Sequence, residues 1–175
     1  MLAGHAGTVE LPAHRVAEQP VPSPKSVHLA LAGRWEGSLR YRDYQDSSRF
    51  VTLPTLLVGA LSADSSRVQL DFEYDDGPGK TVRSRDAFAL DTLGKVLTWG
   101  AADGKRPPSR FTVTSMRAIP LMLMVEMDGE DDDRSARIRE TITIESAELR
   151  IVKEVRFAAD GSWLFRHAYW LARKP

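Results

Sequence analysis

The chain of 175 residues contains no cysteine. This absence excludes thiol catalysis, thiolate metal sites and a disulfide framework. It is compatible with the cytoplasm and equally with a periplasmic or secreted location after removal of an export signal, so it decides between neither compartment.

The chain also lacks an excess of charge of either sign, because 24 Lys and Arg residues balance 24 Asp and Glu residues. Nucleic-acid-binding domains usually carry a clear basic surplus, so we expect no nucleic-acid partner. Long apolar runs are missing too. The longest, Ile119–Val125, is too short to cross a bilayer, and we therefore expect no membrane span.

The first part of the chain has little hydrophobic periodicity and is rich in proline. We expect residues 1–25 to form an extended or disordered lead-in, since such segments cannot bury enough apolar surface to fold alone. The lead-in lacks the basic-then-apolar order of a secretion signal. Residues 26–175 are enough for one domain with its own core.

Within residues 26–175, apolar and polar side chains alternate, which is typical of half-buried antiparallel strands. Turn residues such as Asp103-Gly104 and Asp128-Gly129 separate the alternating runs. We expect about ten strands, at roughly 33–44, 49–61, 67–75, 80–90, 95–100, 109–117, 121–128, 134–145, 148–158 and 162–173. A short helical pattern at Ser26–Ala32 could cap one end of the sheet.

Many strands joined by short turns predict an antiparallel meander, and closure into a barrel removes its two exposed edges. The predicted fold is therefore an all-β, closed antiparallel barrel of about ten strands with a short N-terminal capping helical turn. An open two-sheet sandwich is the alternative.

The first predicted strand opens with Gly33-Arg34-Trp35-Glu36-Gly37. A Gly-x-Trp after a short helical turn resembles the calycin group of barrels, which includes the lipocalins. The resemblance implies that Trp35 plugs one end of the barrel and that Arg173, near the end of the last strand, packs on it. Glycine has no Cβ, so backbone can approach closely around the indole. The alternative is that Trp35 is an ordinary core aromatic.

The sequence departs from the best-known calycins. Lipocalins have eight strands and often disulfides, while fatty-acid-binding barrels insert a helical pair after their first strand. Nitrobindin-type haem barrels resemble this chain in their Gly-x-Trp-x-Gly opening and in a histidine near the C-terminus, which holds the haem iron. That resemblance implies haem as an alternative ligand, with His167 as the axial ligand.

Three of the predicted strands each interrupt an apolar face with one ionisable residue, namely Glu140, Lys153 and His167. A two-residue turn at Ser146-Ala147 would place Glu140 opposite Lys153. A three-residue loop at 159–161 would place Lys153 opposite His167. The three side chains would then lie about 5 Å apart across adjacent strands. Buried charges must be paired, reach water or meet a ligand, so this row is the candidate site; a satisfied structural network is the alternative.

The predicted function is binding of a small, largely apolar or amphipathic ligand inside the barrel, with that row orienting a polar group of the ligand. The apolar wall is expected to come from Tyr41, Trp163, Phe165 and Tyr169. A different possibility is a lyase- or isomerase-type enzyme in which Glu140 or His167 acts as general acid or base.

Two other segments bear on partners and metals. Met122 and Met124 lie in a strand that is apolar on both faces, so they could form a homodimer contact. The acidic run at 128–133 fails the calcium-loop spacing and is expected to be a solvated hairpin tip. No metal site is predicted.

Overall fold

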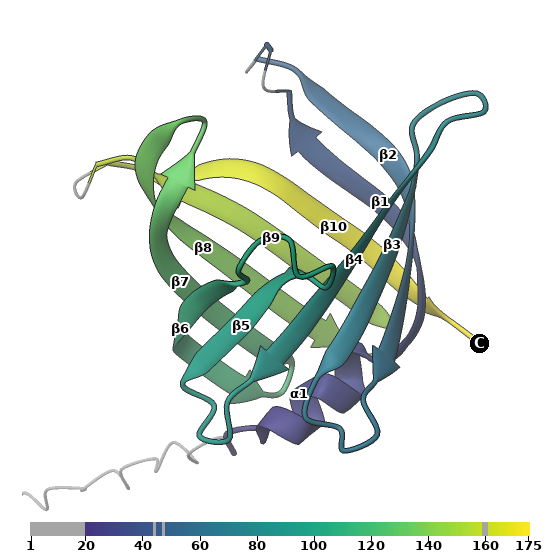
Figure 1. Cartoon of the computed structure of the whole chain (residues 1–175), viewed down its shortest axis with the longest axis vertical. Coiled ribbons are helices and arrows are strands. Elements are labelled where there is room, and N and C mark those ends of the chain that lie inside the picture. The colour runs from purple at the N-terminus through teal and green to yellow at the C-terminus, as the bar shows by residue number, and fades with distance from the viewer. Residues whose placement is uncertain (1–19, 44, 47, 159–160) are drawn as a thin grey trace, which may run out of the picture.

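The protein forms a closed antiparallel barrel in which every strand pairs with its neighbours in sequence and the first strand pairs with the last (Figure 1). The computed structural model describes residues 20–43, 45–46, 48–158 and 161–175. Residues 1–19, which make up most of the expected lead-in, lie outside the described residues. The described elements are α1 (Pro24–Leu31), β1 (Gly33–Arg42), β2 (Phe50–Leu61), β3 (Val68–Asp75), β4 (Thr81–Leu90), β5 (Val96–Ala101), β6 (Ser109–Ala118), β7 (Leu121–Asp131), β8 (Arg134–Glu145), β9 (Glu148–Arg156) and β10 (Leu164–Lys174).

This architecture confirms the predicted fold class and excludes the open sandwich. Each predicted strand is present, and most of the predicted strand ends lie within two residues of the observed ones. The barrel closes where β1 runs antiparallel to β10, with Arg34 opposite Lys174 and Tyr41 opposite His167. Closure satisfies the backbone hydrogen-bonding groups that two free edge strands would expose.

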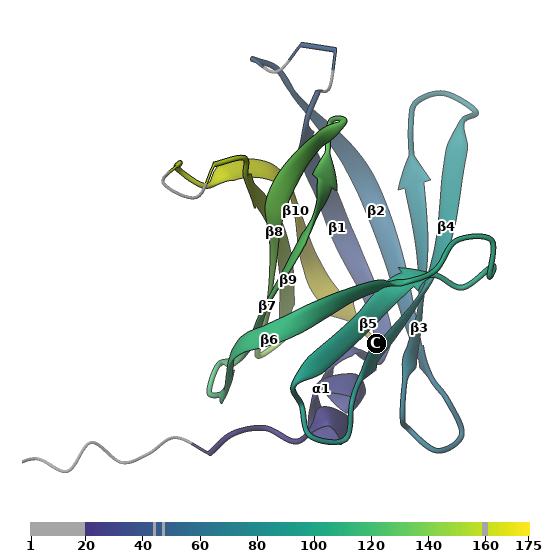
Figure 2. The ribbon, with the colours of Figure 1, turned by 60° about the vertical axis from the view of Figure 1, so that its left-hand side comes forward.

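Helix α1 lies across one end of the barrel (Figure 2). It begins at Pro24, two residues before the predicted start, because Ser23 caps it: the Ser26 N–H donates to Ser23 Oγ at 3.1 Å. One face of α1 is buried against the strands through Val27, His28 and Leu31. The helix therefore forms the closed end of the barrel. It is not long enough to span a membrane.

Trp35 fills the space beneath α1 and is fully buried. Its Nε1 donates to the Leu31 carbonyl oxygen at 3.0 Å. The Arg173 guanidinium lies 4.0 Å from the centre of the indole and donates to the carbonyl oxygens of Ala30 and Ala32, both at 2.7 Å. Because Arg173 holds the last carbonyls of α1, it joins the helix, the first strand and the last strand at one point.

The second glycine of the opening motif is required by the closure of the barrel. A Cβ added at Gly37 would lie 2.0 Å from the Trp170 carbonyl oxygen on β10, which is backbone and cannot move aside. Glycine at this position therefore lets β1 and β10 approach closely beside the indole.

His28 ties α1 to the strands from inside the fold. Its Nδ1 lies 3.0 Å from the Ser65 carbonyl oxygen, and the Leu90 N–H donates to Nε2 at 3.1 Å. This pair of partners fixes the neutral tautomer with the proton on Nδ1. Burial lowers the pKa of His28, and the contact with Ser65 opposes that shift.

We expect His28→Ala to lower the free energy of unfolding by about 2–3 kcal/mol, since it leaves the buried Leu90 N–H without an acceptor. The contribution of His28 to stability should decrease as the pH falls below 6.5, because the unfolded state then binds a proton at His28 that the folded state excludes; the deficit of His28→Ala should therefore shrink at low pH. Urea unfolding from pH 5 to pH 7.5 measures both effects. Leu29→Ala, at a half-exposed position of the same helix, is the control; equal losses in the two variants would contradict the prediction.

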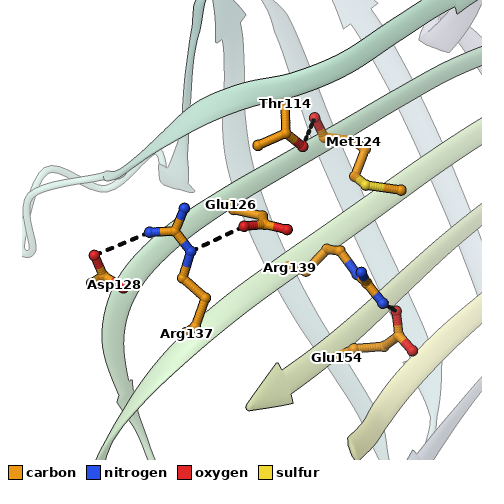
Figure 3. Close-up of polar contacts among 7 residues, drawn as sticks. All are labelled: Thr114, Met124, Glu126, Asp128, Arg137, Arg139 and Glu154. Atoms are coloured by element: carbon orange, nitrogen blue, oxygen red, sulfur yellow. Dashed lines mark hydrogen bonds and ion pairs between the residues drawn. The ribbon is translucent and has the colours of Figure 1, made fainter. Parts of the chain in front are cut away.

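Charged side chains cover the outer face of β7, β8 and β9 (Figure 3). Arg137 donates from Nε to Glu126 and from Nη1 to Asp128, both at 3.0 Å, and Arg139 donates to Glu154 at 2.7 Å. On a strand, the alternate positions must then face inward. The inner face of β8 accordingly carries buried side chains, namely Ala136, Ile138, Glu140, Ile142 and Ile144.

Candidate functional site

The interior of the barrel contains an open cavity of about 480 Å³, which we call the lumen cavity. It is lined by Phe72, Asp86, Trp99, Gly100, Ser109, Phe111, Met127, Glu130, Ile138, Glu140, Lys153, His167 and Tyr169. Its walls combine aromatic and aliphatic side chains with a comparable share of polar and ionisable ones, and polar groups of this kind fix the orientation of ligands in small-molecule sites. Larger hollows of about 580 and 650 Å³ lie on the outer face, among ion-paired surface residues such as Arg85 and Arg137, and we do not assign a site to them.

The row of ionisable residues crosses one wall of the lumen cavity. Glu140 on β8 lies opposite Lys153 on β9, and Lys153 lies opposite His167 on β10, which confirms the predicted register. The predicted turn at Ser146-Ala147 is also confirmed, because Glu145 pairs with Glu148 across it. All three ionisable side chains line the cavity.

Trp163 and Phe165 were expected inside the barrel, and this expectation is wrong. The Phe165 ring packs 5.8 Å from Phe50, and the guanidinium of the outward-facing Arg139 lies 4.0 Å from the centre of the Trp163 ring. Neither aromatic residue lines the lumen cavity.

A β-bulge between Phe165 and His167 explains why Trp163 and Phe165 lie outside the barrel. Leu164 pairs with Val155, one residue away from the register that a three-residue loop would set, and the bulge at Arg166 corrects the offset before His167. The extra residue inverts the alternation, so that Arg166 is buried while Phe165 faces outward. Two residues of the predicted loop, 159 and 160, lie outside the described residues.

The other two predicted wall residues have different positions. Tyr169 lines the lumen cavity; its hydroxyl lies 2.9 Å from that of Tyr74, and its ring packs 5.2 Å from Phe72. Burial raises the pKa of Tyr169 far above its usual value, so the phenol stays protonated. Tyr41 lies opposite His167 on β1 and is not among the residues that line the cavity.

Asp131 is buried, which corrects the expectation that the whole acidic run from 128 to 133 is a solvated tip. Arg166 donates from Nε to Asp131 Oδ2 at 2.6 Å, and Lys153 donates to Oδ1 at 3.2 Å. One buried carboxylate is therefore shared by two cations. The sequence carries no clear signal for this role, because Asp131, Asp132 and Asp133 are adjacent and identical.

Among the ionisable residues of this row, Glu140 has the fewest contacts that offset the cost of burying it. Its Oε2 is buried and has no hydrogen-bond partner among the described residues. Burial raises the pKa of Glu140 to about 8, and the nearby Lys153 only partly offsets this. The side chain is therefore mostly a neutral carboxylic acid at pH 7.

The pKa of His167 is shifted in the opposite direction. Burial and the neighbouring Lys153 ammonium lower its pKa to about 4, against a smaller opposing effect of Asp131. Its imidazole is therefore neutral at pH 7, and it lies edge-on to Tyr169 at 5.6 Å. The cavity thus holds a neutral acid and a neutral base on either side of a cation.

Further polar groups lie on β4 and β5, and the sequence pattern does not identify them. Trp99 Nε1 donates to Asp86 Oδ2 at 3.1 Å, and burial raises the pKa of Asp86. The two residues are cross-strand diagonal neighbours, which becomes evident only once β4 and β5 are in register. Across the described residues, no group of three or more histidine or acidic side chains is placed to hold a metal ion.

Comparison with known proteins gives a structural match only. No protein-family model matches the chain, and no curated protein matches it in sequence. A solved structure of an S-type phycobiliprotein lyase from Guillardia theta superposes with a TM-score of 0.60 at 10% identity, covering 88% of this chain and 94% of that one. The fold is calycin-like.

The raised pKa of Glu140 predicts an unusual pH dependence for the folding stability of this calycin-like barrel. The folded protein keeps Glu140 protonated up to about pH 8, whereas the unfolded chain ionises it near 4.5. The contribution of Glu140 to stability should therefore fall as the pH rises between these values, and Glu140→Gln, which cannot ionise, should escape this loss. We expect the variant to gain about 4 kcal/mol over wild type between pH 5 and pH 9.

Urea unfolding of the calycin-like barrel at both pH values measures this gain. Glu145→Gln, at the exposed end of the same strand, is the matched control. A gap between Glu140→Gln and wild type that does not widen with pH would mean that Glu140 ionises normally in the folded protein.

Proposed function

We propose that this protein binds a small amphipathic molecule in the lumen cavity. The supporting observation is the cavity of about 480 Å³, which is lined by apolar and polar side chains and contains a buried carboxyl oxygen, Glu140 Oε2, with no hydrogen-bond partner among the described residues. A buried polar atom left unsatisfied costs about 1–3 kcal/mol, so a ligand or an ordered water that pairs with it is favoured. Calycin-like barrels offer their interior as a binding space, and a similar solved structure is named a phycobiliprotein lyase.

The binding of the neutral fluorescent probe N-phenyl-1-naphthylamine tests the location of the site. Ser109→Trp should weaken the binding at least about tenfold, since it fills the cavity from a small lining residue. Thr112→Trp places the same ring on the exposed side of the same strand and should leave the affinity unchanged. Equal affinity in both variants, with unchanged circular dichroism, would place the probe outside the lumen cavity, and no binding to wild type would contradict the proposal.

Haem is a second candidate ligand, and the neutral imidazole of His167 in the cavity wall favours it. His167 would supply the axial nitrogen, and Lys153 could pair with a propionate. Wild-type protein mixed with haemin should then develop a Soret band that His167→Ala lacks. An unchanged free-haemin spectrum would exclude this candidate.

An acid–base enzyme is a third candidate, because Glu140 and His167 line one cavity in complementary protonation states. At neutral pH Glu140 could donate a proton while His167 accepts one, as in lyase or isomerase chemistry. The diagnostic result is a product formed by wild type and by neither Glu140→Gln nor His167→Ala, although both variants still bind the substrate.

A homodimer through Met122 and Met124 stays a prediction.

A further inference from the structure

The lining of the lumen cavity carries more carboxyl groups than cationic groups. Its carboxyl groups belong to Asp86 on β4, Glu130 on β7 and Glu140 on β8. Among the same lining residues, only Lys153 has an ammonium group, and the His167 imidazole is neutral at pH 7. The lining is therefore richer in groups that attract a cation than in cations of its own.

The ammonium group of Lys153 is paired with a carboxylate that is not among the lining residues. Lys153 Nζ donates to Asp131 Oδ1 at 3.2 Å. Glu140 lies opposite Lys153 on the neighbouring strand, but among the described residues it forms no ion pair and its Oε2 accepts no hydrogen bond. The direct contact of Lys153 is therefore with Asp131, and Glu140 is left without a cation in contact.

Two carboxyl groups of the lining thus lack a counter-ion. Glu140 is only 7% exposed and lines the cavity, so its unpaired oxygen is buried at a place that a ligand can reach. Asp86 accepts a hydrogen bond from a neutral donor, Trp99 Nε1, at 3.1 Å, and no cationic side chain pairs with it in the part of the chain that the structure describes. A buried carboxyl group of this kind is stabilised by a cation that reaches it.

The two carboxyl groups act on the same part of the cavity, around Tyr169. Burial is the main cause of the raised pKa of Tyr169, and both Glu140 and Asp86 add to it. Such an effect weakens with distance, so both carboxyl groups lie near the phenol. The Tyr169 ring packs 5.2 Å from Phe72, and the faces of aromatic rings attract cations as well.

We propose that the lumen cavity selects a small amphipathic amine whose ammonium group donates hydrogen bonds to Glu140 and Asp86. The apolar body of the amine occupies the rest of the cavity, whose lining includes Phe111, Met127 and Ile138. This inference rests on the proposed function, since it names the ligand class for the same cavity.

Binding of the amine should release a proton from Glu140. The ionisable groups that surround it are those of the cavity lining and of the adjoining ion pair, namely Asp86, Glu130, Asp131, Lys153, His167 and Tyr169. Glu140 has a pKa of about 8 in the empty cavity, so it carries a proton at pH 7. An ammonium group beside it favours the ionised carboxylate, and the proton passes to the buffer.

Three probes with the same apolar body and different head groups test the ligand class. Isothermal titration calorimetry at pH 7 compares 4-phenylbutylamine, 4-phenylbutanol and 4-phenylbutyrate. We expect the amine to bind at least about tenfold more tightly than the alcohol, and the carboxylate to bind most weakly. If the alcohol or the carboxylate binds at least as tightly as the amine, or if only N-phenyl-1-naphthylamine binds, the inference fails while the proposed function survives. If neither the series nor N-phenyl-1-naphthylamine binds, the proposed function itself fails.

The same titrations in phosphate and in Tris, whose ionisation enthalpies differ, measure the released proton. We expect the binding enthalpy of the amine to depend on the buffer, with up to about one proton released per amine bound, and that of the alcohol to be independent of it. An amine enthalpy that is equal in the two buffers would contradict the contact between the ammonium group and Glu140.

Substitutions at the two carboxyl groups locate the selectivity. Glu140→Gln should lower the preference for the amine over the alcohol at least about tenfold and change the affinity for the alcohol less than about threefold. Asp86→Asn keeps an acceptor for Trp99 Nε1 and should lower the same preference. Glu145→Gln removes a carboxylate from the exposed end of β8, outside the lining, and is the matched control. Retention of the full preference in folded Glu140→Gln would overturn the assignment. If that variant does not fold, Asp86→Asn must lower the preference for the assignment to stand.

Discussion

Asp131→Asn is expected to lower the free energy of unfolding by about 3–5 kcal/mol, the range found when one partner is removed from a buried ion pair. The reason is that Lys153 and Arg166 both form ion pairs with this carboxylate, whose side chain is 2% exposed. An asparagine amide has nearly the same size but carries no charge. The loss therefore measures the electrostatic compensation of the two cations more than the packing of the side chain.

The neighbouring aspartate provides the control for this experiment. Asp132 is exposed and has a φ of 55°, a conformation that asparagine adopts readily, so Asp132→Asn should change stability by less than about 0.5 kcal/mol. Adding Lys153→Met to Asp131→Asn should recover part of the loss, because it removes the ammonium group that Asp131 pairs with in the wild-type protein. Equal stability of Asp131→Asn and Asp132→Asn in urea would show that the buried cluster does not stabilise the fold.

Trp35→Ala is the second substitution with a large expected effect, a loss of about 3–5 kcal/mol. It empties the space under α1, removes the donor to the Leu31 carbonyl, and leaves the Arg173 guanidinium without its aromatic partner. Thermal unfolding followed by far-ultraviolet circular dichroism measures the effect. Trp170→Ala, on the outer face of β10 where the indole is 39% exposed, should cost less than about 1 kcal/mol.

A matching loss in the two tryptophan variants would contradict the role of Trp35 in closing the barrel. It would indicate that aromatic area in general, whether inside or outside the barrel, stabilises the fold. The two positions separate these causes because they lie on strands that pair directly in the barrel seam.

The strands and their register followed from local signals in the sequence. Period-two alternation marks each strand, and a two-residue turn fixes its partner, so the position of Glu140 opposite Lys153 could be counted along the chain. The counting succeeded for His167 as well, although the bulge and the longer loop before it were unforeseen. Their offsets cancel at that residue, whereas Trp163 and Phe165 precede the bulge and were placed on the wrong face.

Features that depend on distant strands were not predictable in this way. The sharing of Asp131 between β9 and β10, and the contact between Asp86 and Trp99, appear only after the strands are paired. The lumen cavity has the same origin, since its size depends on how side chains from several strands fill the interior.

The seam between β1 and β10 has a consequence for how this chain folds. Each of the other strand pairs is a neighbouring hairpin, but Trp35 must find Arg173 across nearly the whole length of the domain. Such a contact is entropically costly to form and slow, and during synthesis β10 emerges after the other strands. Until β10 arrives, β1 presents an unpaired edge, so the unfinished chain is most exposed to misassociation with other chains at the strand that carries its plug.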